Sequence, residues 1–254
     1  MPILIFILGT ALGSFLNVCI YRMPRKKSII FPPSRCTRCN KLLKCYELVP
    51  IFSFLFQKGK CRYCGESISP QYPFVEFLNG LLYLILYYRF NLGLDFIFYS
   101  IIFSILIVIS FIDINFQVIP NSINVLLFIT AILYKIFQHL LYSTWPKIFN
   151  SILGLIISGG VFLLIAILSK GGIGGGDIKL IGVLGFILGF KMSILNMVLS
   201  FLLGAIISVF LLLLNIKEIR DQIPFGPFIC LSFIVTVLWG NKIIYWYLFI
   251  IWGE

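Results

Sequence analysis

Two aspartates, Asp113 and Asp177, are the residues of this 254-residue chain that point most directly to chemistry. Each lies beside a strongly apolar stretch, where an ionisable side chain is costly and marks a functional site by default. Two carboxyl groups that meet in such surroundings cannot easily both ionise, so that one keeps a proton while the other activates water. The pair predicts hydrolysis of a peptide bond without histidine, serine or a catalytic metal, and it would titrate as a unit.

A run rich in glycine precedes the second aspartate, with five glycines within six positions. At Gly174, Gly175 and Gly176 an extended peptide could approach the bare backbone and pair with it as a neighbouring strand would. Such backbone is tolerated at membrane depth only where it lines a cavity or is buried in protein. An ordinary turn, with Asp177 capping the next helix, is the alternative. A phosphate loop is not indicated, because no Gly-Lys-Ser/Thr follows.

Four of the seven cysteines form two Cys-x-x-Cys pairs with the spacing of a four-cysteine zinc site: Cys36, Cys39, Cys61 and Cys64. Because four protein ligands leave no position open for water, zinc is expected to be structural here. It would supply the folding energy that a small charged loop cannot draw from an apolar core. Gly65 allows the positive φ that the second turn requires.

The composition places these residues in a membrane. Hydrophobic residues make up 60% of the chain, charged residues only 11%, and the mean hydropathy is +1.06. Ordinary soluble domains have about 25% charged residues. This balance excludes a soluble enzyme, a disordered protein and a collagen-like one. We predict an all-α polytopic membrane protein.

The hydrophobic runs predict about eight transmembrane helices. They cover residues 3–20, 74–90, 96–112, 122–141, 148–168, 178–190, 192–214 and 225–252. The predicted organisation is a first transmembrane helix (1–20), a small zinc-binding loop domain (21–73) and a transmembrane core that carries both aspartates (74–254).

The loop domain also determines the predicted topology. Residues 21–73 hold 11 of the 20 Lys and Arg residues but only two acids, Glu47 and Glu66. By the positive-inside rule this loop is cytoplasmic, which puts both chain termini outside and both aspartates at the cytoplasmic side. A topology signal beside anionic lipid explains the charge better than a nucleic-acid surface does. We therefore expect membrane lipid, and no nucleic acid, as a partner.

Together these motifs resemble one family, the prepilin peptidases (type IV prepilin leader peptidases), which are GxGD-type intramembrane aspartic proteases. The resemblance covers nearly the whole chain in order. Its motifs are GSFLNV (13–18), RMP (22–24), the two cysteine pairs, YPFVE (72–76), residues 113–121, GGGDIKL (174–180) and IPFGPF (223–228).

The resemblance implies a bacterial inner-membrane enzyme that acts at the cytoplasmic face. It would cut the basic leader from type IV prepilins or pseudopilins after a glycine, with Asp113 and Asp177 as the catalytic pair. The chain is similar to the bifunctional form, which then N-methylates the new terminal residue with S-adenosylmethionine. In the family, methyl transfer is associated with the cysteine loop, where Gly59 and Glu76 are the matching positions.

Some features of the chain leave questions open beside the resemblance. Asn115 stands where many members carry an acid, which leaves Asp113 the only acid of that stretch. The basic loop would repel a basic leader, so that the leader must be recognised elsewhere, with Glu47, Glu76 and lipid as candidates. Two other classes are open from the residues alone: an ion-coupled carrier with the aspartates as ion ligands, and a non-catalytic scaffold for assembly of a pilus or secretion machine.

Overall fold

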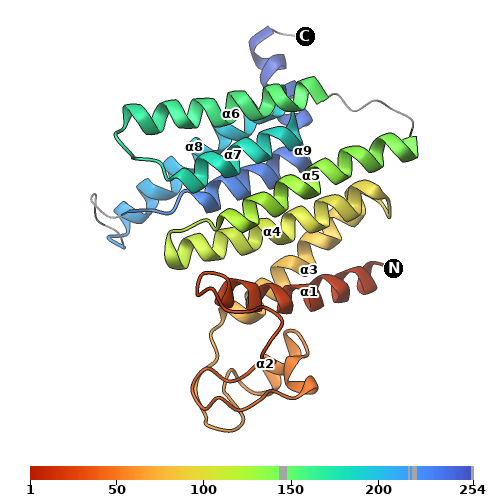
Figure 1. Cartoon of the computed structure of the whole chain (residues 1–254), viewed down its shortest axis with the longest axis vertical. Coiled ribbons are helices and arrows are strands. Elements are labelled where there is room, and N and C mark those ends of the chain that lie inside the picture. The colour runs from red at the N-terminus through yellow and green to blue at the C-terminus, as the bar shows by residue number, and fades with distance from the viewer. Residues whose placement is uncertain (143–147, 217, 219–221, 253–254) are drawn as a thin grey trace. The chain divides into compact units, whose positions relative to one another are not determined.

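The computed structural model describes residues 1–142, 148–216, 218 and 222–252 and is almost entirely helical (Figure 1). Within these residues there is no β-strand, and the only strand-like pairing is a pair of isolated bridges in the cysteine loop. The prediction of an all-α fold is confirmed. The C-terminal residues 253–254, which were expected on the outer side of the membrane, lie outside the described residues.

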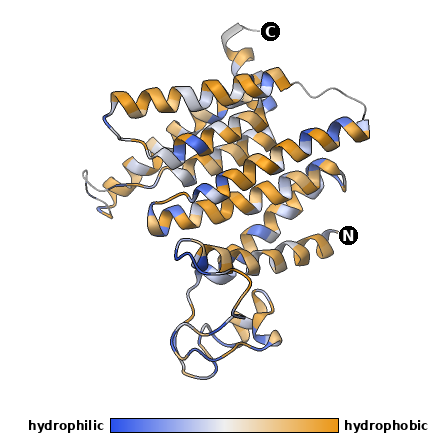
Figure 2. Cartoon of the chain, viewed as in Figure 1, coloured by the Kyte–Doolittle hydropathy of each residue, from blue (hydrophilic) through white to orange (hydrophobic). Residues whose placement is uncertain are grey.

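Eight long helices follow the eight predicted hydrophobic runs, with small differences at their ends. They are α1 (Pro2–Arg22), α3 (Gln71–Phe90), α4 (Leu94–Phe116), α5 (Asn121–Tyr142), α6 (Ile148–Leu168), α7 (Gly175–Leu188), α8 (Phe190–Leu213) and α9 (Gly226–Trp252). Hydrophobic residues predominate along these helices (Figure 2). The cysteine loop between α1 and α3 contains a 3-10 turn, η1 (Cys45–Leu48), and a short helix, α2 (Phe52–Phe56).

Six of the described helices are long and apolar enough to cross a membrane. The two long helices not among them are α3, which carries Glu76 and Arg89, and α7, which has only 14 residues. The chain is a multi-pass membrane protein, while the count of eight spans stays a prediction.

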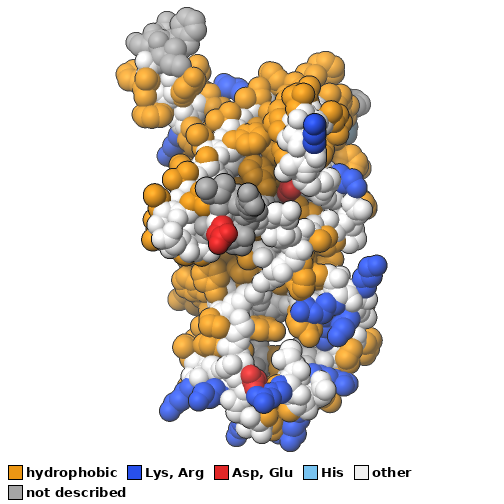
Figure 3. All heavy atoms as spheres, turned by 90° about the vertical axis from the view of Figure 1, so that its left-hand side faces the viewer, with side chains coloured by type: hydrophobic (Ala, Val, Ile, Leu, Met, Phe, Trp, Pro, Cys, Tyr) orange, Lys and Arg blue, Asp and Glu red, His pale blue; other side chains and the backbone are white. Residues whose placement is uncertain are grey.

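The helices group into two compact units, Met1–Ile112 and Asp113–Glu254. The boundary falls inside α4, so that the first unit contains the cysteine loop and the second contains both aspartates. Lys and Arg side chains gather over the loop end of the first unit (Figure 3). The three-part division at residues 20 and 73 follows the predicted membrane boundaries and stays a prediction.

Small residues bring α1 and α3 together in the first unit. A Cβ atom at Gly9 would lie only 2.8 Å from the Cα atom of Gly80. The buried Asn79 side chain donates a hydrogen bond of 2.7 Å to the Gly9 carbonyl and accepts one of 2.9 Å from the Ser104 hydroxyl of α4. Close packing and hydrogen bonds are what hold helices together in lipid, where apolar burial gives little drive.

Small residues and a hydrogen bond also hold α7 against α6 in the second unit. A Cβ atom at Gly154 would collide with the carbonyl oxygen of Gly185, and the reverse substitution would meet the Gly154 carbonyl. The buried Ser158 hydroxyl donates to the carbonyl of Ile181 at 3.0 Å. This contact sets the position of α7, whose first turn carries Asp177.

Gly154→Ala is expected to destabilise the protein by about 1–3 kcal/mol, the usual cost of overpacking, because backbone would have to move. Gly160→Ala is the matched control in the same helix, since nothing lies within 4 Å of its Cβ position. Thermal unfolding in detergent measures both variants. Equal midpoints for Gly154→Ala and Gly160→Ala would contradict the close α6–α7 contact.

Candidate active site and metal centre

Asp113 is held by a backbone group from a distant part of the chain. It lies near the end of α4 and is only 5% exposed. Its Oδ2 accepts a hydrogen bond of 2.9 Å from the N–H of Gly226, the first residue of α9. The first N–H groups of a helix have no partner within the helix, so that the carboxylate satisfies one of them. A Cβ atom at Gly226 would lie 2.7 Å from the same oxygen, so that a side chain at this position would displace the carboxylate.

Asp177 lies in the first turn of α7 and not in the preceding loop. The helix begins at Gly175, three residues before the predicted start at 178, and only Gly174 of the three motif glycines keeps an extended backbone. Glycine is tolerated in this turn because the α6 contact, not helix propensity, holds α7. At Gly176 a larger residue is excluded, since its Cβ atom would lie 2.9 Å from that of Ile119.

The structure brings the two carboxyl groups together. Asp113 and Asp177 are close enough for their charges to interact. The side chain of Ile119 lies close to the Cβ positions of two glycines. One is Gly176, which precedes Asp177, and the other is Gly226, whose N–H binds Asp113. Among the described residues, the buried Oδ1 atom of Asp177 has no hydrogen-bond partner. An unpaired oxygen beside a second carboxyl group is available to a proton, a water molecule or a substrate.

Several residues that shape this site were assigned no role by the sequence reasoning. The Gly226 N–H and the Ile119 side chain are two of them. A third feature is the hydrogen bond of 2.9 Å from the Lys179 ammonium to the Asn121 side chain, which ties the first turn of α7 to the start of α5. The GGGDIKL and IPFGPF motifs contain Lys179 and Gly226, but the residues they contact are distant in sequence.

The four paired cysteines form one cluster. Their Sγ atoms all lie within 4.8 Å of one another, and those of Cys36 and Cys64 are 3.8 Å apart. A tetrahedral zinc ion with Zn–S distances of about 2.3 Å holds its sulfurs about 3.8 Å apart. The cluster therefore fits zinc, with all four positions filled by Cys36, Cys39, Cys61 and Cys64.

The two cysteine turns are built in the same way. In each, the N–H of the first cysteine donates to the carbonyl five residues later, from Cys36 to Lys41 at 3.0 Å and from Cys61 to Glu66 at 2.7 Å. The residue after the second cysteine has positive φ in both turns, and at Gly65 this confirms the prediction (φ 72°). The repeated geometry points the thiols of both turns at a common centre.

The metal-free thiols differ in acidity. Burial raises the pKa of Cys36, but hydrogen bonds from the backbone of Cys39 and Arg38 outweigh it and lower the pKa to about 6. Desolvation, hydrogen bonds to the neighbouring thiols and the charge of Cys36 raise the pKa of Cys64 to about 12. A divalent cation would remove this repulsion, so that all four cysteines could bind as thiolates.

Gly59 and Glu76 both support α2 in the first unit. Glu76 of α3 is buried, and its Oε2 accepts a hydrogen bond of 2.7 Å from the N–H of Ile51, the residue before α2. Gly59 follows α2 with φ of +67° and donates to the Phe54 carbonyl at 2.9 Å. The two residues therefore fix the beginning and the end of this short helix.

Comparison with known proteins gives consistent matches along the chain. The model of the Bacterial Peptidase A24 N-terminal domain matches residues 7–90, and that of the Type IV leader peptidase family matches residues 100–209. A Bacillus subtilis protein named prepilin leader peptidase/N-methyltransferase is 38% identical over 96% of this chain and 97% of its own length. A protein of the same name from Legionella pneumophila is 31% identical, over 98% and 94%. No solved structure gives a significant match.

The cluster predicts one zinc ion per chain in the purified protein, measured by atomic spectroscopy. Cys61→Ser is expected to lose the metal and to make the loop domain sensitive to proteolysis, because the metal supplies most of its folding energy. Cys45→Ser is the matched control, since Cys45 lies in the same loop but outside the cluster. Loss of zinc from the control, or its retention in Cys61→Ser, would contradict the assignment.

Proposed function

The chain belongs to the type IV leader peptidase family, and on that premise we propose that Asp113 and Asp177 are the catalytic pair. The activity of the chain is cleavage of the leader peptide from prepilins, followed by N-methylation of the new terminus. The observation that carries the residue assignment is the pairing of a buried Asp113, fixed by the Gly226 N–H, with the partly buried Asp177.

The two carboxyl groups share one proton in this mechanism. The ionised member takes a proton from water as the water oxygen attacks the carbonyl carbon of the scissile bond, and the protonated member donates to the carbonyl oxygen. When the C–N bond breaks, the leaving nitrogen takes up the proton that came from water, and the former carbonyl oxygen returns its proton to the carboxylate that donated it, which restores the pair. The N–H of Gly226 holds one Asp113 oxygen in place. The unpartnered Oδ1 of Asp177 is the atom best placed to hold the proton or the water.

The backbone before α7 is proposed to bind the substrate peptide. Gly174 is extended and exposed, and nothing lies within 4 Å of the Cβ position of Gly175, so that a peptide could approach the backbone just before α7. A peptide that pairs here would reach Asp177 in the next turn. Catalysis then takes place at the cytoplasmic face of the inner membrane, with both termini of the enzyme outside, as the basic loop predicts.

The loop domain is proposed to carry out the second reaction. S-adenosylmethionine, when bound, supplies the methyl group that the new terminal amine accepts. Gly59 and Glu76 are the proposed methyl-transfer positions, and both act on α2. A zinc ion bound by the four cysteines would stabilise this domain without entering either reaction.

The two other classes are not favoured. The relatives that match nearly the full length of the chain are named as a peptidase and methyltransferase. No observation supports an ion carrier or a scaffold instead. The proposed substrate is accordingly a prepilin or pseudopilin.

Asp113→Asn and Asp177→Asn are each expected to reduce cleavage by about 10²–10⁴-fold, the usual contribution of acid–base groups. Cleavage of a host prepilin in lipid, read by mass spectrometry, measures this loss. Asp95→Asn is the control, because it makes the same change near the other end of α4. A fully active Asp177→Asn enzyme would overturn the catalytic assignment.

Gly226→Ala is expected to slow cleavage while both aspartates remain, because a methyl group would push the Asp113 carboxylate away from its hydrogen-bond donor. The control is Gly240→Ala in the same helix, where the nearest atoms belong to side chains away from the aspartates, the first being the Met192 sulfur at 3.1 Å. Turnover should fall more than apparent substrate affinity. Equal turnover in the two variants would mean that Gly226 does not position Asp113.

A further inference from the structure

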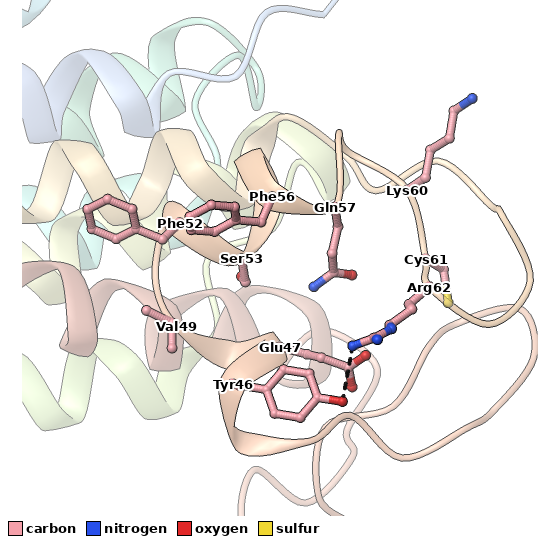
Figure 4. Close-up of a pocket in the computed structure, with 10 residues that line it drawn as sticks. All are labelled: Tyr46, Glu47, Val49, Phe52, Ser53, Phe56, Gln57, Lys60, Cys61 and Arg62. Atoms are coloured by element: carbon pink, nitrogen blue, oxygen red, sulfur yellow. Dashed lines mark hydrogen bonds between the residues drawn. The ribbon is translucent and has the colours of Figure 1, made fainter.

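The loop domain contains a cavity of about 580 Å³ between η1, α2 and the second cysteine turn (Figure 4). We propose that this cavity binds S-adenosylmethionine, with Glu47 as the acceptor for the ribose hydroxyls. The proposal rests on the proposed methyl transfer and assigns that reaction a place within the first unit. The cavity is of a size typical of small-molecule sites, which span about 300–1,000 Å³.

Glu47 is the residue that points to a ligand. It is only 6% exposed, and one of its oxygens, Oε2, accepts a hydrogen bond of 2.8 Å from the N–H of Lys44. The other oxygen, Oε1, is buried and has no hydrogen-bond partner among the described residues. A buried carboxylate oxygen without a partner is costly, and a ligand hydroxyl would satisfy it after a small turn of the side chain. A ribose offers two adjacent hydroxyls.

The two ends of the cavity differ in character, as Figure 4 shows. At one end Phe52 and Phe56 present their rings from α2, although they are 61% and 85% exposed. Exposed aromatic faces of this kind suit an adenine ring, which stacks on them. At the other end lie Glu47, Tyr46 and Arg62, with a hydrogen bond of 3.3 Å from the Arg62 guanidinium to the Tyr46 hydroxyl.

The polar end matches the charges of the amino-acid part of the ligand. Arg62 offers a guanidinium fork, the group best suited to a carboxylate. Lys60, the other cation of the lining, points away from the remaining residues in Figure 4. Glu47 supplies the negative charge that a sulfonium and an ammonium group require in a loop that is otherwise strongly basic. Base, sugar and amino acid each find a complementary group.

The walls of the cavity depend on the two residues proposed for methyl transfer. Ile51 directly precedes Phe52 and has φ of 62°, a strained conformation for a β-branched residue, and Glu76 holds its N–H. Gly59 makes the turn that separates the lining residues Gln57 and Lys60. Neither Gly59 nor Glu76 lines the cavity, so we assign both as positioning residues for it.

The test is the affinity of the zinc-loaded, full-length enzyme for methyl-labelled S-adenosylmethionine, measured by equilibrium binding. Glu47→Gln keeps an oxygen for the Lys44 N–H and is expected to weaken binding about tenfold or more. Glu66→Gln is the matched control and should bind as the wild type does, because Glu66 lies in the same loop and pairs with Arg38. Zinc content and thermal midpoint check the folding of each variant.

Two further measurements separate a binding role from a structural one. Phe56→Ala changes a side chain that is 85% exposed, and it should also weaken binding. Wild type should bind a 2′,3′-dideoxyribose analogue more weakly than S-adenosylmethionine. Glu47→Gln should bind the two compounds with equal affinity. Wild-type affinity in both Glu47→Gln and Phe56→Ala would overturn this cavity and leave the methyl transfer intact. A folded wild type that cleaves prepilin but neither binds nor uses S-adenosylmethionine would overturn both.

Discussion

A carboxyl group in apolar surroundings must find its polar partners within the protein, and the second unit is arranged around that requirement. Asp113 is only 5% exposed, and its Oδ2 accepts a hydrogen bond from the Gly226 N–H. That N–H is free because it begins a helix, and it can come close only because Gly226 has no side chain. The position of Asp113 therefore depends on α9, and that of Asp177 depends on the glycine contact between α6 and α7.

The loop domain needs another source of folding free energy, because it is too small and too charged to fold around an apolar core. Two equivalent cysteine turns gather four thiols for a metal, and Glu76 ties the start of α2 to α3. In this scaffold the unpartnered oxygen of Glu47 is an exception to the satisfied polar contacts around it. Such an exception is understandable in an enzyme if a ligand completes the site, which is the reason for the proposed cofactor cavity.

The sequence predicted those features that follow from local pattern. Hydropathy placed the eight long helices, and cysteine spacing predicted the cluster that the structure brings together. The start of α7 was placed too late, since a run of glycines resembles a loop and only packing against α6 makes it helical. Gly226 and Asp113 are 113 positions apart, so their hydrogen bond could not be read from either motif. The Glu47 cavity was missed as well, because its lining residues are common types that only the fold of the loop assembles.

The central claim is that the two aspartates act together on a peptide bond that becomes tetrahedral. The most direct measurement is the affinity of the enzyme for a leader peptide in which a hydroxyl-bearing tetrahedral carbon replaces the scissile carbonyl. Such mimics bind at least about 100-fold more tightly than substrate when a site is complementary to the transition state. The account predicts that wild type shows this preference and that Asp113→Asn and Asp177→Asn each lose it. An unchanged preference in either variant would contradict the two-aspartate mechanism.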